Sequence, residues 1–364
     1  MKLTKTVLVI GAGINGLSCA ILLQKAGCKV TIISKDDPQT HHSNSIFASY
    51  FPSASIIPHS IYSDELIPLF RESLHYFVSL HKHEYQGIGI NEHYELFEFQ
   101  KAIPAYAPLI PNFTELEAFE SSWHPKHHSI KINSGWKFDC FFADWSIYYP
   151  ALLEEFINRG GKLEIKRLDI DSIQRLPFQL IVNCAGAGAS ELFEQKNPLL
   201  YRGHLIHVSG APILRNPLNK RVSYNFSPKT TSGKSSDVYC YPRKDGWILG
   251  GSRQKGTLGE SGFWLGEESG ELAEVINGVE APKRILKLNK EIIKDSFGLN
   301  LDDYQQRSIK VGYRYVRDTN NGLRLEAEEW GDKLIIHNYG HGGAGVTLSW
   351  GCAQKVVSMI EARA

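Results

Sequence analysis

The chain has 364 residues, of which 42% are hydrophobic and 22% are charged, and its formal net charge is +1. This length and hydrophobic content allow a large core and predict two domains. A charge so close to zero offers no broad electrostatic field for nucleic acid or for acidic membranes, so we expect neither as a partner.

The cysteines and histidines predict neither a disulfide framework nor a metal centre. The six cysteines show no pairwise motif spacing, and in a chain of this length they predict buried thiols. The histidine clusters at residues 41–42 and 124–128 are expected to lie in solvated loops and not to bind a metal. The apolar run over residues 7–23 is interrupted by Asn15 and by glycines, so it predicts neither a membrane span nor a signal peptide, and we expect a cytoplasmic protein.

A dinucleotide fingerprint opens the chain. Residues 6–10 form an apolar run that predicts a buried parallel strand, and a glycine-rich turn and an apolar helix that closes at Gly27 follow it. The first glycine permits the tight turn, the second lets the backbone approach a pyrophosphate, and the third lets the helix pack on the strand. Glycines at such a turn can serve packing alone, but the strand and helix around them favour a nucleotide site, with free N–H groups at the helix N-terminus. The residues predicted to bind the cofactor here are Gly11, Gly13, Ile14, Asn15 and Gly16.

The second strand, over residues 29–34, ends without the acidic residue that usually holds the ribose of a dinucleotide. Ser34 stands at that position, and Lys35 and Asp36 follow it. We predict that Ser34 and Asp36 contact the ribose, through a hydroxyl and a carboxylate. Lys35 leaves open an alternative in which the site recognises the phosphate of NADP, although this alternative does not explain the glycines near the C-terminus.

The middle of the chain predicts two interleaved units. Residues 145–158 are expected to form a helix, and residues 162–165 and 179–184 two strands that return the chain to the nucleotide-binding sheet. The aromatic-rich, alternating segments 204–208 and 238–250 suit an antiparallel sheet that is covered on one face. A substrate domain built from two insertions is therefore expected.

A second glycine-rich junction follows near the C-terminus. Residues 334–339 predict a buried strand, residues 340–345 are rich in glycine, and a helix comes after them. A dissociable hydride carrier such as NAD needs only one phosphate-binding turn, whereas a retained flavin also needs residues that hold its ring. The two junctions therefore favour FAD over NAD.

Short motifs run in a fixed order along the chain. They are 181–186 (IVNCAG), 201–204 (YRGH), 239–242 (YCYP), 311–317 (VGYRYVR), 324–326 (RLE), 337–343 (HNYGHGG), Thr347 and 350–353 (WGCA). Together they resemble the D-amino-acid oxidase and D-aspartate oxidase family. The resemblance spans nearly the whole chain, although regions 65–135 and 256–305 carry no matching motif.

The resemblance implies an α/β fold class with interleaved domains. A doubly wound, Rossmann-type FAD-binding domain is expected over residues 1–60, 140–195 and 325–364. An α+β substrate-binding domain, built on an antiparallel sheet, is expected over residues 61–139 and 196–324.

The resemblance also implies a reaction. In the family, the Cα hydrogen of a D-amino acid leaves as hydride to flavin N5, the imino acid hydrolyses to a 2-oxo acid and ammonia, and oxygen reoxidises the flavin with release of hydrogen peroxide. Such a reaction depends mainly on orientation. Arg314 resembles the family's carboxylate-binding arginine and Tyr239 its partner tyrosine, although alone they would equally suit a surface ion pair and a core aromatic. The family usually has proline after this arginine, whereas Tyr315 stands here.

The second junction resembles the family's flavin-ring loop. Its N–H groups and the helix N-terminus behind it would stabilise negative charge on the reduced ring. The alternative is a tight loop that needs glycine only for positive φ. The resemblance assigns to the flavin Gly342, Gly343, Ala344, Gly345, Val346 and Thr347, with Gly343 also at the catalytic site, and adds Ala185 and Gly186 from the central strand.

Two segments resemble the D-aspartate oxidase branch of the family. Residues 250–256 include Arg253, which in that branch helps to recognise a second carboxylate, and residues 57–60 include His59, a pocket histidine there. A cation and an imidazole would favour an acidic side chain, so the prediction extends to a preference for D-aspartate or D-glutamate. An arginine at this position can also be a solvated charge. The stretch 48–59 can be aligned with the family sequences in two ways.

Two other functions stay open. A glycine or secondary-amine oxidase shares the N-terminal fold, but Arg314 so close ahead of the Tyr-Gly-His-Gly-Gly loop disfavours it. A catalytically idle flavin-binding protein is supported by the departures at Ser34 and Tyr315. Oxygen is the expected electron acceptor, with a quinone-like carrier as the alternative, and the oligomeric state is left open.

Overall fold

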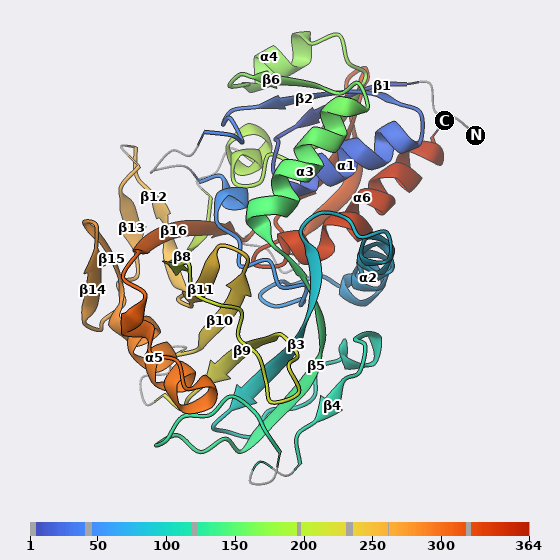
Figure 1. Ribbon diagram of the computed structural model, residues 1–364. Coiled ribbons are helices and arrows are strands. Elements are labelled where there is room, and N and C mark those ends of the chain that lie inside the picture. Colours follow the sequence, from blue (N-terminus) through green and yellow to red (C-terminus); the bar gives the residue numbers. More distant parts are fainter. Residues whose placement is uncertain are drawn as a thin grey trace.

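Two large sheets organise the chain in the computed structural model, which describes residues 5–40, 46–117, 119, 122–194, 198–230, 236–260, 262–317 and 322–363. A six-stranded sheet lies near the two termini and a mainly antiparallel sheet lies beyond it (Figure 1). The first and last helices pack side by side in the layer that covers the six-stranded sheet, so the two ends of the sequence meet. The predicted α/β fold class is confirmed.

The six-stranded sheet has the order β17-β18-β7-β1-β2-β6. Neighbouring strands are parallel except β17 and β18, which form an antiparallel hairpin at one edge. Because β1 lies between β2 and β7, the strand order reverses there, and such a reversal creates the crevice in which α/β sheets bind ligands. The strands are β1 (Thr6–Ile10), β2 (Lys29–Ser34), β6 (Lys162–Ile165), β7 (Leu180–Asn183), β17 (Arg324–Trp330) and β18 (Lys333–Tyr339).

The side chains of β1 alternate between two cores. Val7 and Val9 pack with three long helices on one face, and Leu8 and Ile10 pack with the short helix α4 on the other. All four side chains are buried, and each contributes roughly 1.5–3 kcal/mol, which explains why this stretch is apolar throughout. The helices are α1 (Ile14–Lys25), α3 (Trp145–Asn158), α4 (Ile170–Arg175) and α6 (Gly345–Glu361).

The second sheet has the order β13-β12-β8-β11-β10-β9-β3-β5-β4, and β16 pairs with β8 along its whole length. All neighbours are antiparallel except β3 and β9. Its strands are β3 (Ile88–Phe97), β4 (Thr114–Glu115), β5 (Ser134–Ala143), β8 (Leu200–Ser209), β9 (Val222–Ser227), β10 (Val238–Arg243), β11 (Gly246–Gly250), β12 (Gln254–Leu258), β13 (Trp264–Gly266) and β16 (Arg307–Tyr315). A separate hairpin joins β14 (Ala273–Ile276) and β15 (Val279–Pro282), and a further long helix is α2 (Leu66–Lys82).

The two faces of the antiparallel sheet have different partners. Helix α5 (Lys283–Phe297) covers one face, where Ile292 packs in one core with Tyr224 of β9. Alternation along a strand then turns Asn225 of β9 to the opposite face, and its cross-strand partner Tyr239 of β10 lies beside it. That opposite face is turned toward the six-stranded sheet and forms one wall of the site described below.

Several predicted elements are confirmed. The helix predicted over 145–158 is α3, the strand predicted over 162–165 is β6, and the segment 238–250 is the hairpin of β10 and β11. Among the described helices, none is both long and apolar enough to span a bilayer.

The predicted domain boundaries stay a prediction. Strand β5 crosses the boundary placed between residues 139 and 140. Helix α2, which lies in a segment assigned to the substrate-binding domain, packs against α6, and the Ser73 hydroxyl accepts a hydrogen bond of 2.8 Å from the Gly351 amide. The two predicted units therefore share α2 as a common layer.

Candidate functional site

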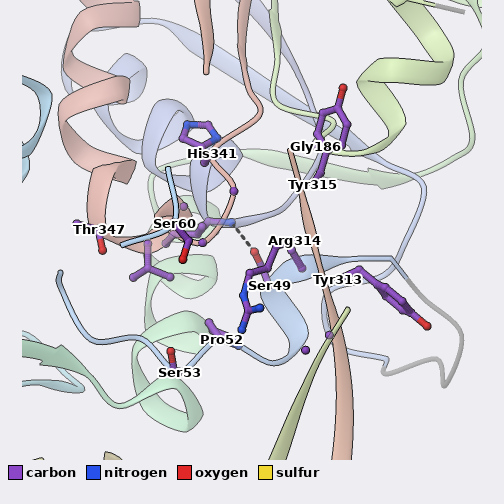
Figure 2. A pocket seen from close by; sticks show the side chains of 18 of the residues that line it. Ser49, Pro52, Ser53, Ser60, Gly186, Tyr313, Arg314, Tyr315, His341 and Thr347 are labelled. Atoms are coloured by element: carbon purple, nitrogen blue, oxygen red, sulfur yellow. Dashed lines mark hydrogen bonds between the residues drawn. The ribbon is translucent and has the colours of Figure 1, made fainter. Parts of the chain in front are cut away.

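A cavity of about 650 Å³ lies where β1, β2 and β7 end and the antiparallel sheet begins. Figure 2 shows Ser49, Arg314, His341 and Thr347 around a pocket of the molecule, and all four line this cavity. The predicted site residues that line it are Gly11, Gly13, Ile14, Asn15, Ser34, Asp36, His59, Ala185, Gly186, Tyr239, Arg253, Arg314, Gly342, Gly343, Gly345, Val346 and Thr347.

Gly16 and Ala344 are the predicted site residues that do not line the cavity. A Cβ at Gly16 would lie 1.9 Å from the carbonyl oxygen of Gly11, so this glycine packs α1 on the turn, which is the role expected for the third glycine of the fingerprint. Ala344 is fully buried at the N-cap of α6. Both residues shape the site through packing.

The first glycine-rich turn is tightly built. Gly11 has a φ of +100°, and a Cβ there would lie 2.6 Å from the carbonyl oxygen of Cys184, so the turn requires glycine. The Ile14 amide at the start of α1 donates a hydrogen bond of 3.0 Å to the hydroxyl of Ser49, which Figure 2 marks. Ser49 also lines the cavity. No motif in the sequence points to it, because it lies 35 positions away from Ile14.

Ser34 and Asp36, which are predicted to contact the ribose, both line the cavity. Ser34 is buried, and its hydroxyl donates a hydrogen bond of 2.7 Å to the backbone carbonyl of Asp36. That donor is therefore engaged, and the Ser34 oxygen remains as an acceptor. Lys35 also lines the cavity.

Three of the amides predicted to face the flavin ring are engaged within the protein. The Gly342 amide donates to the carbonyl of Tyr315 at 3.1 Å, the Gly343 amide to the carbonyl of Ser60 at 3.0 Å, and the Ala344 amide to the carbonyl of His341 at 2.9 Å. These three N–H groups are therefore not available, which corrects the prediction for them. The free donors lie in the first turn of α6, whose N-cap residue makes no side-chain cap.

The first-turn amides of α6 belong to Gly345, Val346 and Thr347, and all three residues line the cavity. None of these amides has a hydrogen-bond acceptor among the residues that the structure describes. The N-terminus of α6 also carries the positive end of the helix dipole. This end of the cavity therefore suits a ligand atom that carries negative charge.

Two buried polar atoms show that the cavity fits a large polar cofactor. The Oδ1 atom of Asn15 and the Nε2 atom of His341 have no hydrogen-bond partner among the described residues, and both residues line the cavity. Burial lowers the pKa of His341 to about 3, so its imidazole is neutral at physiological pH. The N-termini of α1 and α6 lie side by side on the cavity, since a Cβ at Gly345 would be 3.4 Å from Nδ2 of Asn15. Together with the unpartnered atoms they suit the pyrophosphate and ring heteroatoms of FAD.

Arg314 and Tyr239 lie together on the antiparallel sheet wall. The Arg314 guanidinium donates a hydrogen bond of 3.2 Å to the carbonyl of Ser252. Burial lowers the pKa of Arg314, and the neighbouring Tyr239 hydroxyl partly offsets this effect. The Tyr239 ring rests on Gly250, where a Cβ would lie 2.1 Å from the ring, so a glycine is needed beneath it. In the described part of the chain, Arg314 makes no ion pair with a carboxylate.

Tyr315 stands where the D-amino-acid oxidase family usually has proline. The strand continues through this position. β16 continues through Tyr315 in register with Leu200 of β8. The Tyr315 ring stacks on Tyr339 with an interplanar angle of 22°, and its carbonyl accepts the Gly342 amide. The substitution therefore connects the strand of Arg314 to the second glycine junction.

A buried carboxylate, which the sequence analysis missed, stands beside His59. Glu95 of β3 lines the cavity with a side chain only 2% exposed, and its Oε1 atom lies 3.1 Å from Nε2 of His59. The region 65–135 carries no matching family motif, and only the alternation of strand residues 88–97 could have indicated that this carboxylate faces inward. Arg253 also lines the cavity, with an exposed side chain.

The described residues contain no candidate metal site. No group of three His, Cys, Asp or Glu side chains there is arranged to hold a metal ion. The six cysteines are free and buried.

The chain resembles curated oxidases over nearly its whole length. It is 25% identical to a D-amino-acid oxidase of Dictyostelium discoideum over 98% of this chain and 91% of that protein. It is 27% identical to the human D-aspartate oxidase over 98% of this chain and 95% of that protein. Among solved structures, the fold is similar to glycine oxidase from Geobacillus kaustophilus, with a TM-score of 0.66 at 15% identity over 99% of this chain and 95% of that chain.

A family model settles the family. Residues 6–359 match the model described as DAO, FAD dependent oxidoreductase. The matched range includes the fingerprint at β1, Arg314 and the start of α6, which are the parts that build the cavity. The chain therefore belongs to the DAO family of FAD-dependent oxidoreductases.

Proposed function

We propose that this protein oxidises D-amino acids to 2-oxo acids and ammonia, with FAD as its cofactor and oxygen as the electron acceptor. The observation that carries the proposal is the position of Arg314, a half-buried cation without a carboxylate partner among the described residues, on the cavity that both glycine junctions line. An unpaired charge that is partly removed from water is costly unless a ligand neutralises it. The α-carboxylate of an amino acid is such a ligand.

The chain's own residues bind and orient the substrate. Arg314 can donate two parallel hydrogen bonds to a carboxylate, and the adjacent Tyr239 hydroxyl can add a third. FAD, when bound, would supply the hydride acceptor, and oxygen would take up the electrons to give hydrogen peroxide. The free amides at Gly345, Val346 and Thr347 stabilise negative charge at their end of the cavity. Orientation by these groups, rather than a general acid or base, is the protein's main contribution.

The names of the curated relatives support D-amino acids as the substrate class. The relatives from Dictyostelium discoideum and Rubrobacter xylanophilus are named D-amino-acid oxidases, each 25% identical to this chain. The neighbouring glycine oxidase structure, at 15% identity, supports the fold alone. The alternatives of a glycine oxidase and of an idle flavin-binding protein are therefore left to experiment.

Anaerobic bleaching of the flavin absorbance tests the proposal. Purified protein is mixed with single D-amino acids, their L-enantiomers, glycine or N-methylglycine in the absence of oxygen. We expect bleaching by D-amino acids only. Bleaching by glycine and N-methylglycine alone would support the amine oxidase, and no bleaching by any amine would support the idle protein.

A preference for acidic D-amino acids is a second candidate, favoured by Arg253. This cation lines the cavity, and its charge lowers the pKa of Tyr239 against the larger effect of burial, so it lies near the carboxylate clamp. His59, the other residue predicted to favour an acidic side chain, is instead paired with Glu95. Arg253→Leu tests whether the arginine recognises the substrate side chain or is only a solvated charge. If it recognises an acidic side chain, the substitution should lower kcat/KM for D-aspartate far more than for D-alanine.

A further inference from the structure

Three polar side chains form a row across the substrate wall of the cavity. Glu95 of β3 is the cross-strand partner of Asn225 of β9, and Asn225 is the partner of Tyr239 of β10. All three line the cavity, and their strand neighbours Tyr94 and Tyr224 point to the core beneath α5. Since neighbouring strands lie about 4.8 Å apart, Glu95 stands roughly 10 Å from Tyr239 across the wall.

The hydrogen bonds of Glu95 leave one oxygen unused. Its Oε1 atom accepts from Nδ2 of Asn225 at 2.7 Å and lies 3.1 Å from Nε2 of both His59 and His93. Its Oε2 atom has no hydrogen bond to any residue that the structure describes, although the residue lines the cavity. Three donors therefore converge on one oxygen, and the other remains an acceptor for a ligand.

Glu95 is ionised, and its fully buried neighbour His93 does not cancel its charge. Burial opposes ionisation of this carboxyl, but His59 and His93 outweigh it and hold the pKa well below its usual range. Burial lowers the pKa of His93, whose Nδ1 lies 2.9 Å from the Ser223 hydroxyl, so His93 is neutral and donates to Glu95 through Nε2. A buried anion thus stands at this end of the wall.

The charges of the wall are separated. Burial raises the pKa of Tyr239, and the charges of Arg314 and Arg253 oppose this rise, so both cations belong to the clamp end of the row. Glu95 occupies the other end, with Asn225 between them. A ligand with a carboxylate at one end and a cation at the other would be complementary to both ends, whereas a second carboxylate would meet the Glu95 anion.

We infer that Glu95 is a specificity-determining residue that binds the cationic end of a long D-amino acid side chain, such as that of D-lysine or D-arginine. The inference rests on the oxidase function proposed above. His59 and Asn225 act as positioning residues, because they hold Oε1 and leave Oε2 directed to the ligand. The span of roughly 10 Å suits a long side chain and leaves D-alanine without contact to Glu95.

Glu95→Gln tests the inference, because glutamine keeps an oxygen for the three donors and replaces the unused acceptor with an NH₂ group. The readout is the binding of two unreactive carboxylates, 6-aminohexanoate and hexanoate, to the FAD-loaded protein by calorimetry. We expect the wild type to bind 6-aminohexanoate more tightly than hexanoate. The variant should lose about tenfold or more in affinity for 6-aminohexanoate and little for hexanoate, as expected for a charged hydrogen bond. In turnover, kcat/KM should fall for D-lysine and not for D-alanine.

Glu98→Gln is the matched control, because Glu98 follows the same strand, does not line the cavity and accepts the Lys229 amide. It should leave both affinities unchanged. Equal affinities of the wild type for the two carboxylates, or equal losses in the Glu95 variant, would overturn the inference, and the wild-type comparison applies even if the variant does not fold. A wild type that prefers glutarate would overturn it in favour of an acidic side chain. Failure of the oxidase function itself would appear separately, as an unbleached flavin with intact carboxylate binding.

Discussion

Gly203 of β8 lies directly beneath the guanidinium of Arg314 on β16. A Cβ at Gly203 would lie 2.9 Å from Nη2 and 3.0 Å from Nη1 of Arg314. Any residue larger than glycine would therefore displace the guanidinium. Gly203 is paired with Gly312, two residues before the arginine, so the Arg314 side chain leans back along its own strand over this gap. The carboxylate clamp thus depends on a residue that has no side chain.

Gly203→Ala should therefore displace the guanidinium without removing it. We expect weaker binding of simple carboxylates and a higher KM, with FAD still bound, because the methyl group leaves the six-stranded sheet untouched. Titration with hexanoate and steady-state kinetics measure the effect. Gly89→Ala is the control, since the nearest atom to its Cβ would be 3.6 Å away, on Arg221. Equal effects of the two substitutions would argue against a steric role of Gly203.

Arg314→Ala should remove the clamp altogether. Two charged hydrogen bonds, each worth roughly 1.5–3 kcal/mol, predict a fall in kcat/KM of at least about a hundredfold. Arg314→Lys should recover little of this, because an ammonium cannot donate two parallel hydrogen bonds in the same plane. Lys310→Ala removes an exposed cation from the same strand and should change kcat/KM very little. If kcat/KM survives in the alanine variant, Arg314 lies outside the reaction site.

Gly13→Asp should abolish FAD retention. The residue stands at the N-cap of α1 and lines the cavity, so a carboxylate there would oppose the pyrophosphate by charge and by volume. The ratio of flavin to protein absorbance after gel filtration measures retention. NADP in place of FAD in the nucleotide extracted from the native protein would contradict the assignment of the site.

The free energy of unfolding should decrease as the pH falls below 6.5. Burial, followed by three neighbouring arginines, lowers the pKa of His204 from 6.5 to about 4. Between these values the unfolded chain binds a proton that the folded chain does not, so stability rises with pH across this window, by up to about 1.4 kcal/mol per pH unit. His204→Gln should reduce the slope of urea-denaturation stability against pH, whereas His75→Gln, with an exposed side chain, should not. An unchanged slope in the His204 variant would mean that this imidazole is protonated in the folded state.

Local sequence predicted the parts of the fold that depend on neighbouring residues. Helix α3 was predicted over 145–158 because its glycine stop and apolar spacing lie within one segment, and β1 because its apolar run is continuous. The placement of Arg314 and Tyr239 in one cavity was expected only from the family resemblance, since they are on strands far apart in the sequence.

The rest depended on contacts between distant segments. The amides of Gly342 and Gly343 were predicted to be free, but the carbonyls that accept them belong to Tyr315 and Ser60. The pairing of His59 with Glu95 joins a loop to a strand across a region without any recognisable motif. The alternation along residues 88–97 could have indicated that Glu95 faces inward, but not that it would meet His59.

The meeting of α1 with α6 also has a consequence for biosynthesis. Residues 333–361 supply the neighbour of β7 in the parallel sheet, the free amides of the cavity and a helix that covers the face of β1. A chain emerging from the ribosome has its fingerprint turn long before it has these parts, because synthesis proceeds from the N-terminus. Capture of the flavin should therefore wait for α6, and a ribosome-bound chain should remain colourless until α6 has left the ribosome and has docked beside α1.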